Sequence, residues 1–243
     1  MRVAVLGPNG LIGSAVMNGL RRCGHDAVGI GHGAADVSVD LGDPANVQSG
    51  WFADCDVLVH CAGVTDEEVK ADLGAAARRA MAGTEALTRA AKEAGVRRFV
   101  YVSSAHVYGP LVGDIDETRP VNPVSDYALL HFAAEQVLRR NVGSDATGGL
   151  LLRPCAVFGS LPDPARFRRW SLVPFSFPRD AATLHEIRLA SAGTQRRNFV
   201  SSDAVASAIT DWLEKPVGGV TLANALGVDD LSVFALAERS AAI

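Results

Sequence analysis

The chain has 243 residues, of which 48% are hydrophobic and 21% are charged, and its formal net charge is −4. This composition is ordinary for a globular protein, with room for one large domain or for a domain with a small appendage. It has no basic stripe and no apolar run of the ~18–20 residues that cross a bilayer, so nucleic acid and membranes are poor candidates as partners. The first residues, MRVAVLGPNG, lead straight into a strand pattern rather than a signal peptide, and the four cysteines form no CxxC pair, so we expect a cytoplasmic protein with reduced thiols.

Apolar strand-like runs alternate with helix-like stretches along most of the chain. Strands are expected at residues 3–6, 27–30, 57–60, 99–102, 150–152, 198–200 and 220–223. Helices are expected at residues 11–23, 45–51, 67–94 with a break near Gly74, 125–141, 202–213 and 231–242. Parallel strands need crossover connections, so this alternation predicts an α/β protein of the Rossmann type, with a doubly wound parallel sheet.

The regular alternation is lost between residues 158 and 197, which are rich in Pro, Arg and aromatic residues. This stretch is expected to be a loop-rich cap over the carboxyl edge of the sheet. We therefore expect a dinucleotide-binding domain at residues 1–157 and a small C-terminal substrate cap at residues 158–243. Segments at about 198–213 are expected to return to the Rossmann core.

A glycine-rich segment lies between the first expected strand and the first expected helix. Its glycines allow a tight turn and a close approach of the backbone to a pyrophosphate, and the N–H groups at the helix start favour phosphate charge. The segment therefore predicts a dinucleotide site. Its expected cofactor-binding residues are Gly7, Asn9, Gly10, Leu11, Ile12 and Gly13.

The end of the second expected strand bears on the choice of dinucleotide. A carboxylate there would bind the ribose 2′-hydroxyl of NAD. The sequence has Gly31-His32-Gly33 instead, so no carboxylate repels a 2′-phosphate and His32 could approach one. This favours NADP over NAD, unless His32 is simply a turn residue.

Further motifs follow the other expected strands: Asp40-Leu41-Gly-Asp43, His60-Cys-Ala-Gly63, Tyr101-Val-Ser-Ser-Ala-His-Val-Tyr-Gly109, Leu152-Arg-Pro154 and Arg197-Asn-Phe-Val-Ser-Ser-Asp203. With the G-x-x-G-x-x-G turn, they make the chain resemble the extended short-chain dehydrogenase/reductase family, in its NAD-dependent epimerase/dehydratase branch, over about residues 1–240. The resemblance implies that Asp40 and Leu41 flank the adenine. It also implies that Cys61, Ala62 and Gly63 line the cofactor, and that Pro154 to Val157 face the nicotinamide.

The resemblance also implies a catalytic Ser, a Tyr and a Lys four residues after the Tyr. Ser104 and Tyr127 stand at the first two positions, but His131 replaces the Lys. A free phenol has a pKa near 10, which the family lowers with the ammonium and the cationic nicotinamide. His131 would share a helical face with Tyr127 and could hold a ribose hydroxyl, yet it should be mostly neutral at pH 7. Ala80 is a second departure, because the family commonly has Asn there.

Lysines elsewhere offer no replacement, since none is placed to reach Tyr127 in the expected fold; they are Lys70, Lys92 and Lys215. Three functions therefore stay open. A reductase could use neutral Tyr127 as the proton donor, with Ser104 orienting the carbonyl. An epimerase or 4,6-dehydratase begins by oxidising and needs a base, so the His counts against it. The third possibility is a cofactor-binding scaffold, regulator or non-redox biosynthetic protein without redox turnover.

The substrate side is expected to be formed by the cap. The resemblance places Arg197 where a nucleotide diphosphate is often contacted, and Arg can do so bidentately. His106, two residues after Ser104, would point toward the pocket. Arg166, Arg168, Arg169 and Trp170 form a cluster that is either a ligand site or a solvated loop face. We expect a small-molecule substrate, such as a nucleotide sugar, and no metal site. The resemblance implies a homodimer formed through the helices at 67–94 and 125–141.

Overall fold

The computed structural model describes residues 1–33, 35–39, 42–142, 147–215 and 218–242. Asp40 and Leu41, expected beside the adenine, lie outside the described residues. A seven-stranded sheet has the order β3-β2-β1-β4-β5-β6-β9, and a three-stranded sheet has the order β10-β8-β7. The larger sheet consists of β1 (Arg2–Leu6), β2 (Asp26–Gly31), β3 (Val37–Ser38), β4 (Val57–His60), β5 (Arg98–Val102), β6 (Gly148–Pro154) and β9 (Gly219–Ala225).

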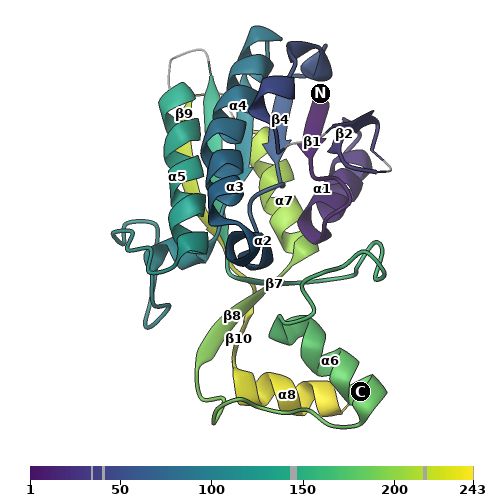
Figure 1. The fold of residues 1–243 in the computed structure, drawn as a ribbon, viewed down its shortest axis with the longest axis vertical. Helices are drawn as coiled ribbons and strands as arrows, with labels where there is room; N and C mark the ends of the chain where they lie inside the picture. The colour runs from purple at the N-terminus through teal and green to yellow at the C-terminus, as the bar shows by residue number, and fades with distance from the viewer. Residues whose placement is uncertain (34, 40–41, 143–146, 216–217, 243) are drawn as a thin grey trace.

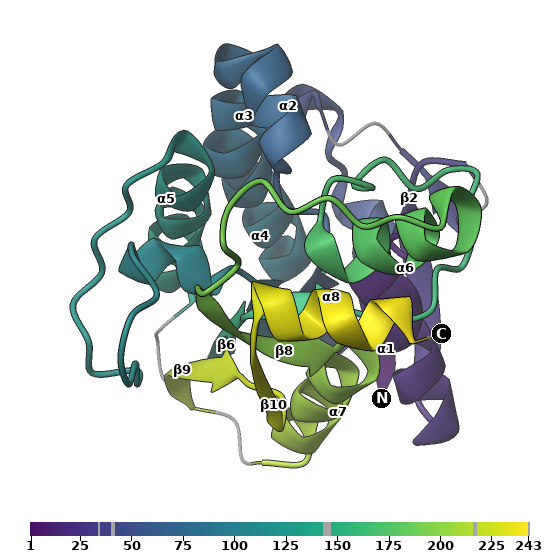
Figure 2. The same ribbon diagram turned by 90° about the horizontal axis from the view of Figure 1, so that it is seen from below.

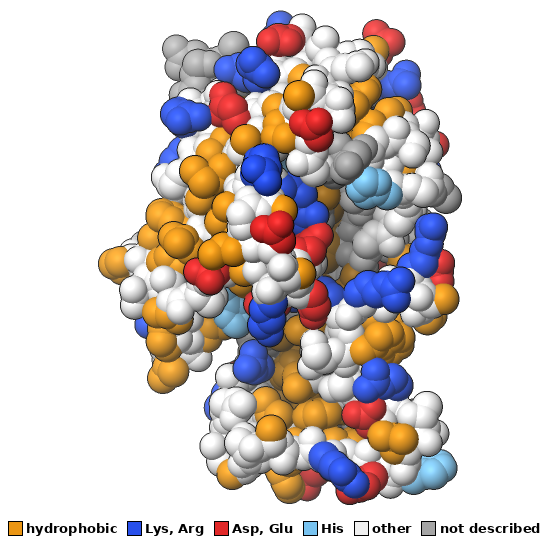
Figure 3. All heavy atoms as spheres, viewed as in Figure 1, with side chains coloured by type: hydrophobic (Ala, Val, Ile, Leu, Met, Phe, Trp, Pro, Cys, Tyr) orange, Lys and Arg blue, Asp and Glu red, His pale blue; other side chains and the backbone are white. Residues whose placement is uncertain are grey.

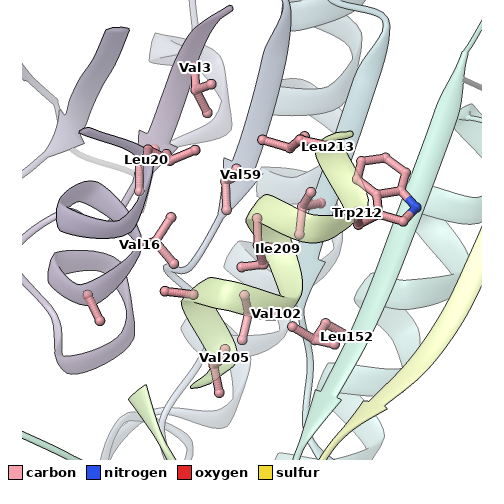
Figure 4. Close-up of a cluster of buried hydrophobic side chains, with 14 of the residues drawn as sticks. Val3, Val16, Leu20, Val59, Val102, Leu152, Val205, Ile209, Trp212 and Leu213 are labelled. Atoms are coloured by element: carbon pink, nitrogen blue, oxygen red, sulfur yellow. The ribbon is translucent and has the colours of Figure 1, made fainter. Parts of the chain in front are cut away.

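All strand pairs of the seven-stranded sheet are parallel. From β1, the chain adds β2 and β3 on one side and β4, β5, β6 and β9 on the other. Its central strands are continuous apolar runs, because helices cover both faces. One face packs against α1 (Leu11–Arg22) and α7 (Ser202–Leu213), as Figure 4 shows for Val16, Leu20 and Ile209. The other face packs against α4 (Thr84–Glu93) and α5 (Asp126–Asn141). The prediction of a doubly wound Rossmann-type fold is confirmed.

The expected helix at 67–94 is divided into α2 (Asp66–Ala71), α3 (Leu73–Arg78), a π-helical turn (Arg79–Gly83) and α4. The break expected near Gly74 falls at Asp72, because the Asp72 backbone is extended (φ −155°, ψ 97°) and its carboxylate accepts from the N–H of Ala75 to cap α3. A π-helical turn inside a helix frequently marks a functional site.

A smaller lobe lies beneath the large sheet in Figure 1 and faces the viewer in Figure 2. It contains β7 (Ala156–Phe158), β8 (Arg196–Ser201), β10 (Asp229–Ser232), α6 (Val173–Leu184) and α8 (Val233–Ala241). The loop-rich cap expected at 158–197 also contains a helix that was not predicted, α6, which buries Phe175 and Phe177 and packs on α8. The last helix begins at Val233 rather than at residue 231, because residues 229–232 pair with β8 as a strand.

The chain crosses between the lobes several times. Within residues 198–213, β8 belongs to the three-stranded sheet, whereas α7 packs against α1 in the large lobe. β9, further along, is the seventh strand of the large sheet. Within the described part of the chain, no helix combines the length and apolarity required to span a bilayer.

Candidate active site

The glycine-rich turn joins β1 to α1 and depends on glycine at specific positions. Gly7 has φ +76°, and its N–H donates to the Ile30 carbonyl at 3.0 Å. A Cβ on Gly13 would overlap the carbonyl oxygen of Gly7. Gly10 precedes α1, and no side chain caps the N–H groups of its first turn. These N–H groups can therefore donate hydrogen bonds to an anionic ligand, as a pyrophosphate site requires.

A cleft of about 510 Å³ begins at this turn and continues between the two lobes. The predicted site residues that line it are Asn9, Gly10, Leu11, Ile12, Gly13, Cys61, Gly63, Ser104, His106, Tyr127, His131, Pro154, Val157 and Arg197. On the face in Figure 3, Lys and Arg side chains lie among Asp and Glu side chains near the narrow part of the molecule where the lobes meet.

Three described residues of the predicted site lie outside the cleft lining: Gly7, His32 and Ala62. Gly7 and Ala62 pack together beneath the turn, since a Cβ on Gly7 would be 3.2 Å from the Ala62 Cβ. His32 is exposed after β2, and its carbonyl accepts from the Asn9 side chain at 2.9 Å. Gly7 and Ala62 therefore shape the cradle, while Asn9 fixes the loop that follows β2.

Ser104 and Tyr127 meet at the carboxyl edge of the large sheet. Ser104 is buried directly after β5, and its hydroxyl accepts from the His106 N–H at 3.3 Å. Tyr127 lies in the first turn of α5, which Ser125 caps. Burial raises the pKa of the Tyr127 phenol, while the Arg169 guanidinium and the Ser104 hydroxyl oppose that rise. The phenol is therefore protonated at neutral pH.

His131 is 3% exposed and lies against Tyr127, with 4.5 Å between the ring centroids. Its Nε2 is 3.1 Å from the Val64 carbonyl oxygen, and its Nδ1 is 2.9 Å from the Tyr101 hydroxyl. A carbonyl oxygen only accepts, so Nε2 carries the proton and Nδ1 accepts from Tyr101. Burial lowers the pKa of His131 to about 4. The imidazole is therefore neutral with both nitrogens paired inside the protein, whereas the sequence suggested that one of them holds a ribose hydroxyl.

The position of Ala80 is also apolar. Ala80 lies in the π-helical turn and packs in a cluster with Val64, Val69 and Leu130. The adjacent Arg79 donates to the Gly63 carbonyl at 3.2 Å and to Glu68 Oε2 at 2.7 Å. Arg79 thus holds the turn under His131 in place. The sequence analysis missed it, although the T-x-x-E capping box at 65–68 was a local signal for this helix start.

A buried ion pair supports the same edge of the sheet. Glu135 on α5 accepts from Arg153 Nε at 2.9 Å and Nη2 at 2.6 Å, and from the Ser103 hydroxyl at 2.6 Å. Arg153 also stacks on Tyr108, with 4.7 Å from its Cζ to the ring centroid. The network connects α5, β5 and β6 directly behind Ser104.

The two thiols in the cleft are not activated. Burial raises the pKa of Cys61 to about 12 and that of Cys155 to about 11. Both therefore stay protonated, which disfavours their use as nucleophiles. Among the residues that the structure describes, no group of three His, Cys, Asp or Glu side chains could hold a metal ion.

Four arginines of the smaller lobe line the cleft: Arg166, Arg168, Arg169 and Arg197. The Arg166 guanidinium lies beside Gly33, since a Cβ there would be 3.0 Å from Nη1. Arg169 pairs with Asp66 at 3.6 Å. Arg197 has a buried Nε without a hydrogen-bond partner among the described residues, and with burial its charge lowers the pKa of His106. Buried donors of this kind are suited to an anionic ligand.

Comparison with known proteins places the chain in a family. The family model described as "NAD dependent epimerase/dehydratase family" matches residues 3–224, so the chain belongs to this NAD-dependent family. It is 31% identical over 137 residues to mouse dTDP-D-glucose 4,6-dehydratase, in an alignment with 55% of this chain and 36% of that protein. It is 31% identical over 183 residues to the UDP-glucose 4-epimerase of Mycolicibacterium smegmatis, in an alignment with 68% of this chain and 58% of that protein. The chain thus spans about a third to just over half of the length of these relatives.

Solved structures share the fold. MoeE5 in complex with UDP-glucose and NAD superimposes with a TM-score of 0.86 at 22% identity, over 100% of this chain and 81% of the other. The Thermus thermophilus UDP-glucose 4-epimerase, in complex with NAD, gives 0.84 at 23% identity, over 100% of this chain and 83% of the other. At these identities the likeness shows the fold alone.

Proposed function

We propose that the protein is an NAD(P)-dependent reductase that acts on a carbonyl group of a nucleotide sugar or a related small metabolite. The reduced nicotinamide, when bound in the cleft, supplies a hydride to the carbonyl carbon. Tyr127 gives its phenolic proton to the carbonyl oxygen and is reprotonated from solvent. Ser104 donates a hydrogen bond to that oxygen. The observation that carries this proposal is the neutral, fully paired His131 beside Tyr127.

The direction of proton transfer follows from the state of Tyr127. Reduction needs a protonated phenol, and burial keeps this phenol protonated. Epimerisation and 4,6-dehydration begin with substrate oxidation, for which the phenol must act as a base. Each pKa unit by which the phenol is raised makes its deprotonated form about 1.4 kcal/mol less accessible at a given pH. The site therefore favours reduction over the reactions named for the relatives.

The ligands are proposed from the same cleft. Nucleotide sugars are suggested by the relatives' names, and Arg197 has the buried free donor that a diphosphate could take. The cradle of Gly7, Gly10 and Gly13 fits a dinucleotide pyrophosphate. Arg166 beside Gly33 would accommodate a ribose 2′-phosphate, so we propose that NADP is accepted together with the family's NAD.

A second candidate is a cofactor-binding protein without redox turnover. Two side chains favour it. Both nitrogens of His131 are already paired, so neither is free to bind a ribose, and Ala80 is packed among apolar residues. This protein would keep the dinucleotide as a structural or regulatory ligand.

One experiment separates the two candidates. Oxidation of NADH and of NADPH is followed with a panel of keto-sugar nucleotides, for the natural chain, Tyr127→Phe and His131→Lys. A reductase turns over at least one substrate and loses about a hundredfold or more in rate with Tyr127→Phe. If the natural chain binds NAD by calorimetry but only His131→Lys turns over, the reductase proposal is refuted and the second candidate stands.

We also propose a homodimer formed through the helices of one face. Leu73, Met81 and Leu129 are 47%, 47% and 50% exposed on α3, the π-helical turn and α5. Hydrophobic side chains are visible among charged ones over these helices in Figure 3. Sedimentation velocity tests this, because Leu129→Glu should shift a dimer toward monomer, whereas a sedimentation coefficient typical of a monomer for the natural chain would refute it.

A further inference from the structure

A cation from the smaller lobe lies in the cleft with Tyr127. We infer that Arg169 is a positioning residue that acts through Tyr127, whose phenolate its guanidinium stabilises, the task that the family resemblance assigns to a lysine at position 131. This inference rests on the proposed function, in which Tyr127 transfers the proton. It concerns a residue outside the Ser-Tyr-Lys pattern, on a segment that joins β7 to α6.

Ion pairs hold the Arg169 side chain in place. Its Nη2 is 3.6 Å from Asp66 Oδ2, and its Nε is 3.5 Å from Glu67 Oε2, both in the first turn of α2. The Ser171 hydroxyl donates to Glu67 Oε1 at 3.4 Å. These contacts attach the segment to the turn that follows β4, whose Val64 carbonyl accepts from His131. Arg169, Tyr127 and His131 all line the cleft.

The Arg169 side chain is 30% exposed, so its charge is partly shielded from water. Its Nε is buried without a hydrogen-bond partner among the described residues, although Glu67 is within ion-pair distance. A guanidinium stays protonated at every relevant pH, unlike the imidazole of His131. Arg169 is thus a permanent cation, whereas a neutral ring occupies the lysine position.

The groups around Tyr127 act in different directions. His131 on the same helix is neutral, and burial also lowers the pKa of His106, whose ring is 6.1 Å from that of Tyr127. After the effect of burial, Arg169 is the largest influence that lowers the pKa of Tyr127, whereas the Asp66 carboxylate raises it. The same guanidinium disfavours protonation of both imidazoles. It therefore favours a negative phenolate, while burial is the main reason that both imidazoles are neutral.

Arg169 could instead serve only as a latch between the lobes. The two roles differ in the effect of Glu67→Gln, which breaks one of the two ion pairs that attach Arg169 to α2 but keeps the cation. A latch predicts that Glu67→Gln disturbs Tyr127 as Arg169→Gln does. A charge effect predicts that only loss of the cation raises the pKa of Tyr127.

The test measures the ionisation of Tyr127 directly. The chain contains three tyrosines, and Tyr101 and Tyr108 are 1% exposed. Uniform labelling with 3-fluorotyrosine, whose phenol ionises at lower pH than that of tyrosine, gives three ¹⁹F resonances, and the Tyr127→Phe variant assigns the one of interest. Its midpoint is followed in Arg169→Gln, Arg169→Lys and Glu67→Gln, with the exposed neighbour in Arg168→Gln as the matched control.

Arg169→Gln should raise the midpoint of Tyr127 by about one pH unit, within the range for an opposite charge nearby. Arg169→Lys should keep most of the natural value, and Arg168→Gln and Glu67→Gln should not raise it. If Arg169→Gln does not fold, Asp66→Asn takes its place and should lower the midpoint. An unchanged midpoint in folded Arg169→Gln, or an equal rise in Glu67→Gln, overturns the inference. The titration does not depend on enzymatic turnover. An active Tyr127→Phe variant would refute the reductase proposal, and that result is distinct from the outcome of the titration.

Discussion

Removal of Glu135 should be among the most damaging single changes in the large lobe. Its carboxylate is fully buried and accepts three hydrogen bonds, two of them from Arg153, which is itself 2% exposed. In Glu135→Leu the guanidinium stays in a site without a counter-charge, and the Ser103 hydroxyl loses its acceptor. Breaking one partner of a buried pair costs about 3–5 kcal/mol, whereas replacing both with apolar residues is often near neutral.

Urea unfolding followed by circular dichroism measures this effect through the midpoint at constant slope. Glu135→Leu should lose about 3–5 kcal/mol, and Glu135→Leu combined with Arg153→Met should recover most of the loss. The surface pair of Arg140 and Glu85, 70% and 37% exposed at 2.7 Å, is the matched control. Its Glu85→Leu variant should change stability by less than about 1 kcal/mol. A double variant no more stable than Glu135→Leu alone would refute the reasoning.

Three other predictions concern the cleft. Gly13→Ala should weaken NAD binding in calorimetry by at least about tenfold, because the new Cβ overlaps the Gly7 carbonyl, whereas Gly50→Ala, with open space around it, should not; equal affinities would contradict this. The pKa of His131 is lowered to about 4, so between pH 6.5 and 4 this residue is protonated in the unfolded chain but not in the folded chain. The free energy of unfolding should therefore fall as the pH drops through this range. His131→Gln should reduce that slope by up to about 1.4 kcal/mol per pH unit, and an unaltered slope would count against a neutral imidazole. Arg166→Ala should weaken NADPH binding by about tenfold and NADH binding much less, and an equal loss for both would remove Arg166 from 2′-phosphate recognition.

Local signals were enough to predict the large lobe. The buried strands are continuous apolar runs, and the glycines of the turn lie close together in the sequence. Both features could therefore be predicted without tertiary information. The course of α6 could not be predicted, since Pro174 and Pro178 weaken the helical pattern and Phe177 packs against residues of α8, far along the chain. The break near Gly74 was also predicted, although the cap that Asp72 provides for α3 was not.

The candidate site divides in the same way. Ser104, Tyr127 and His131 were predicted from sequence motifs of the family, and all three line the cleft. The pairing of His131 with Val64 and Tyr101, however, joins three elements that no sequence pattern connects. Arg169 was visible only as one member of a basic-aromatic cluster in the sequence. Its contact with α2 exists because the smaller lobe folds back over the cleft, which is a property of the tertiary structure.

Because the chain passes repeatedly between the lobes, a single cleavage of the backbone should not separate them. β6 continues into β7, β8 leads directly into α7, and β9 is followed by β10. The Cys155 N–H donates to the Ala225 carbonyl at 3.2 Å, and Asn198 and Gly227 exchange two hydrogen bonds, so these connections are tied to one another. A protease that nicks the segment before α6 would therefore leave both halves noncovalently joined. The smaller lobe cannot be expressed as a contiguous fragment that keeps its three strands without also carrying α7 and β9, both of which belong to the large lobe.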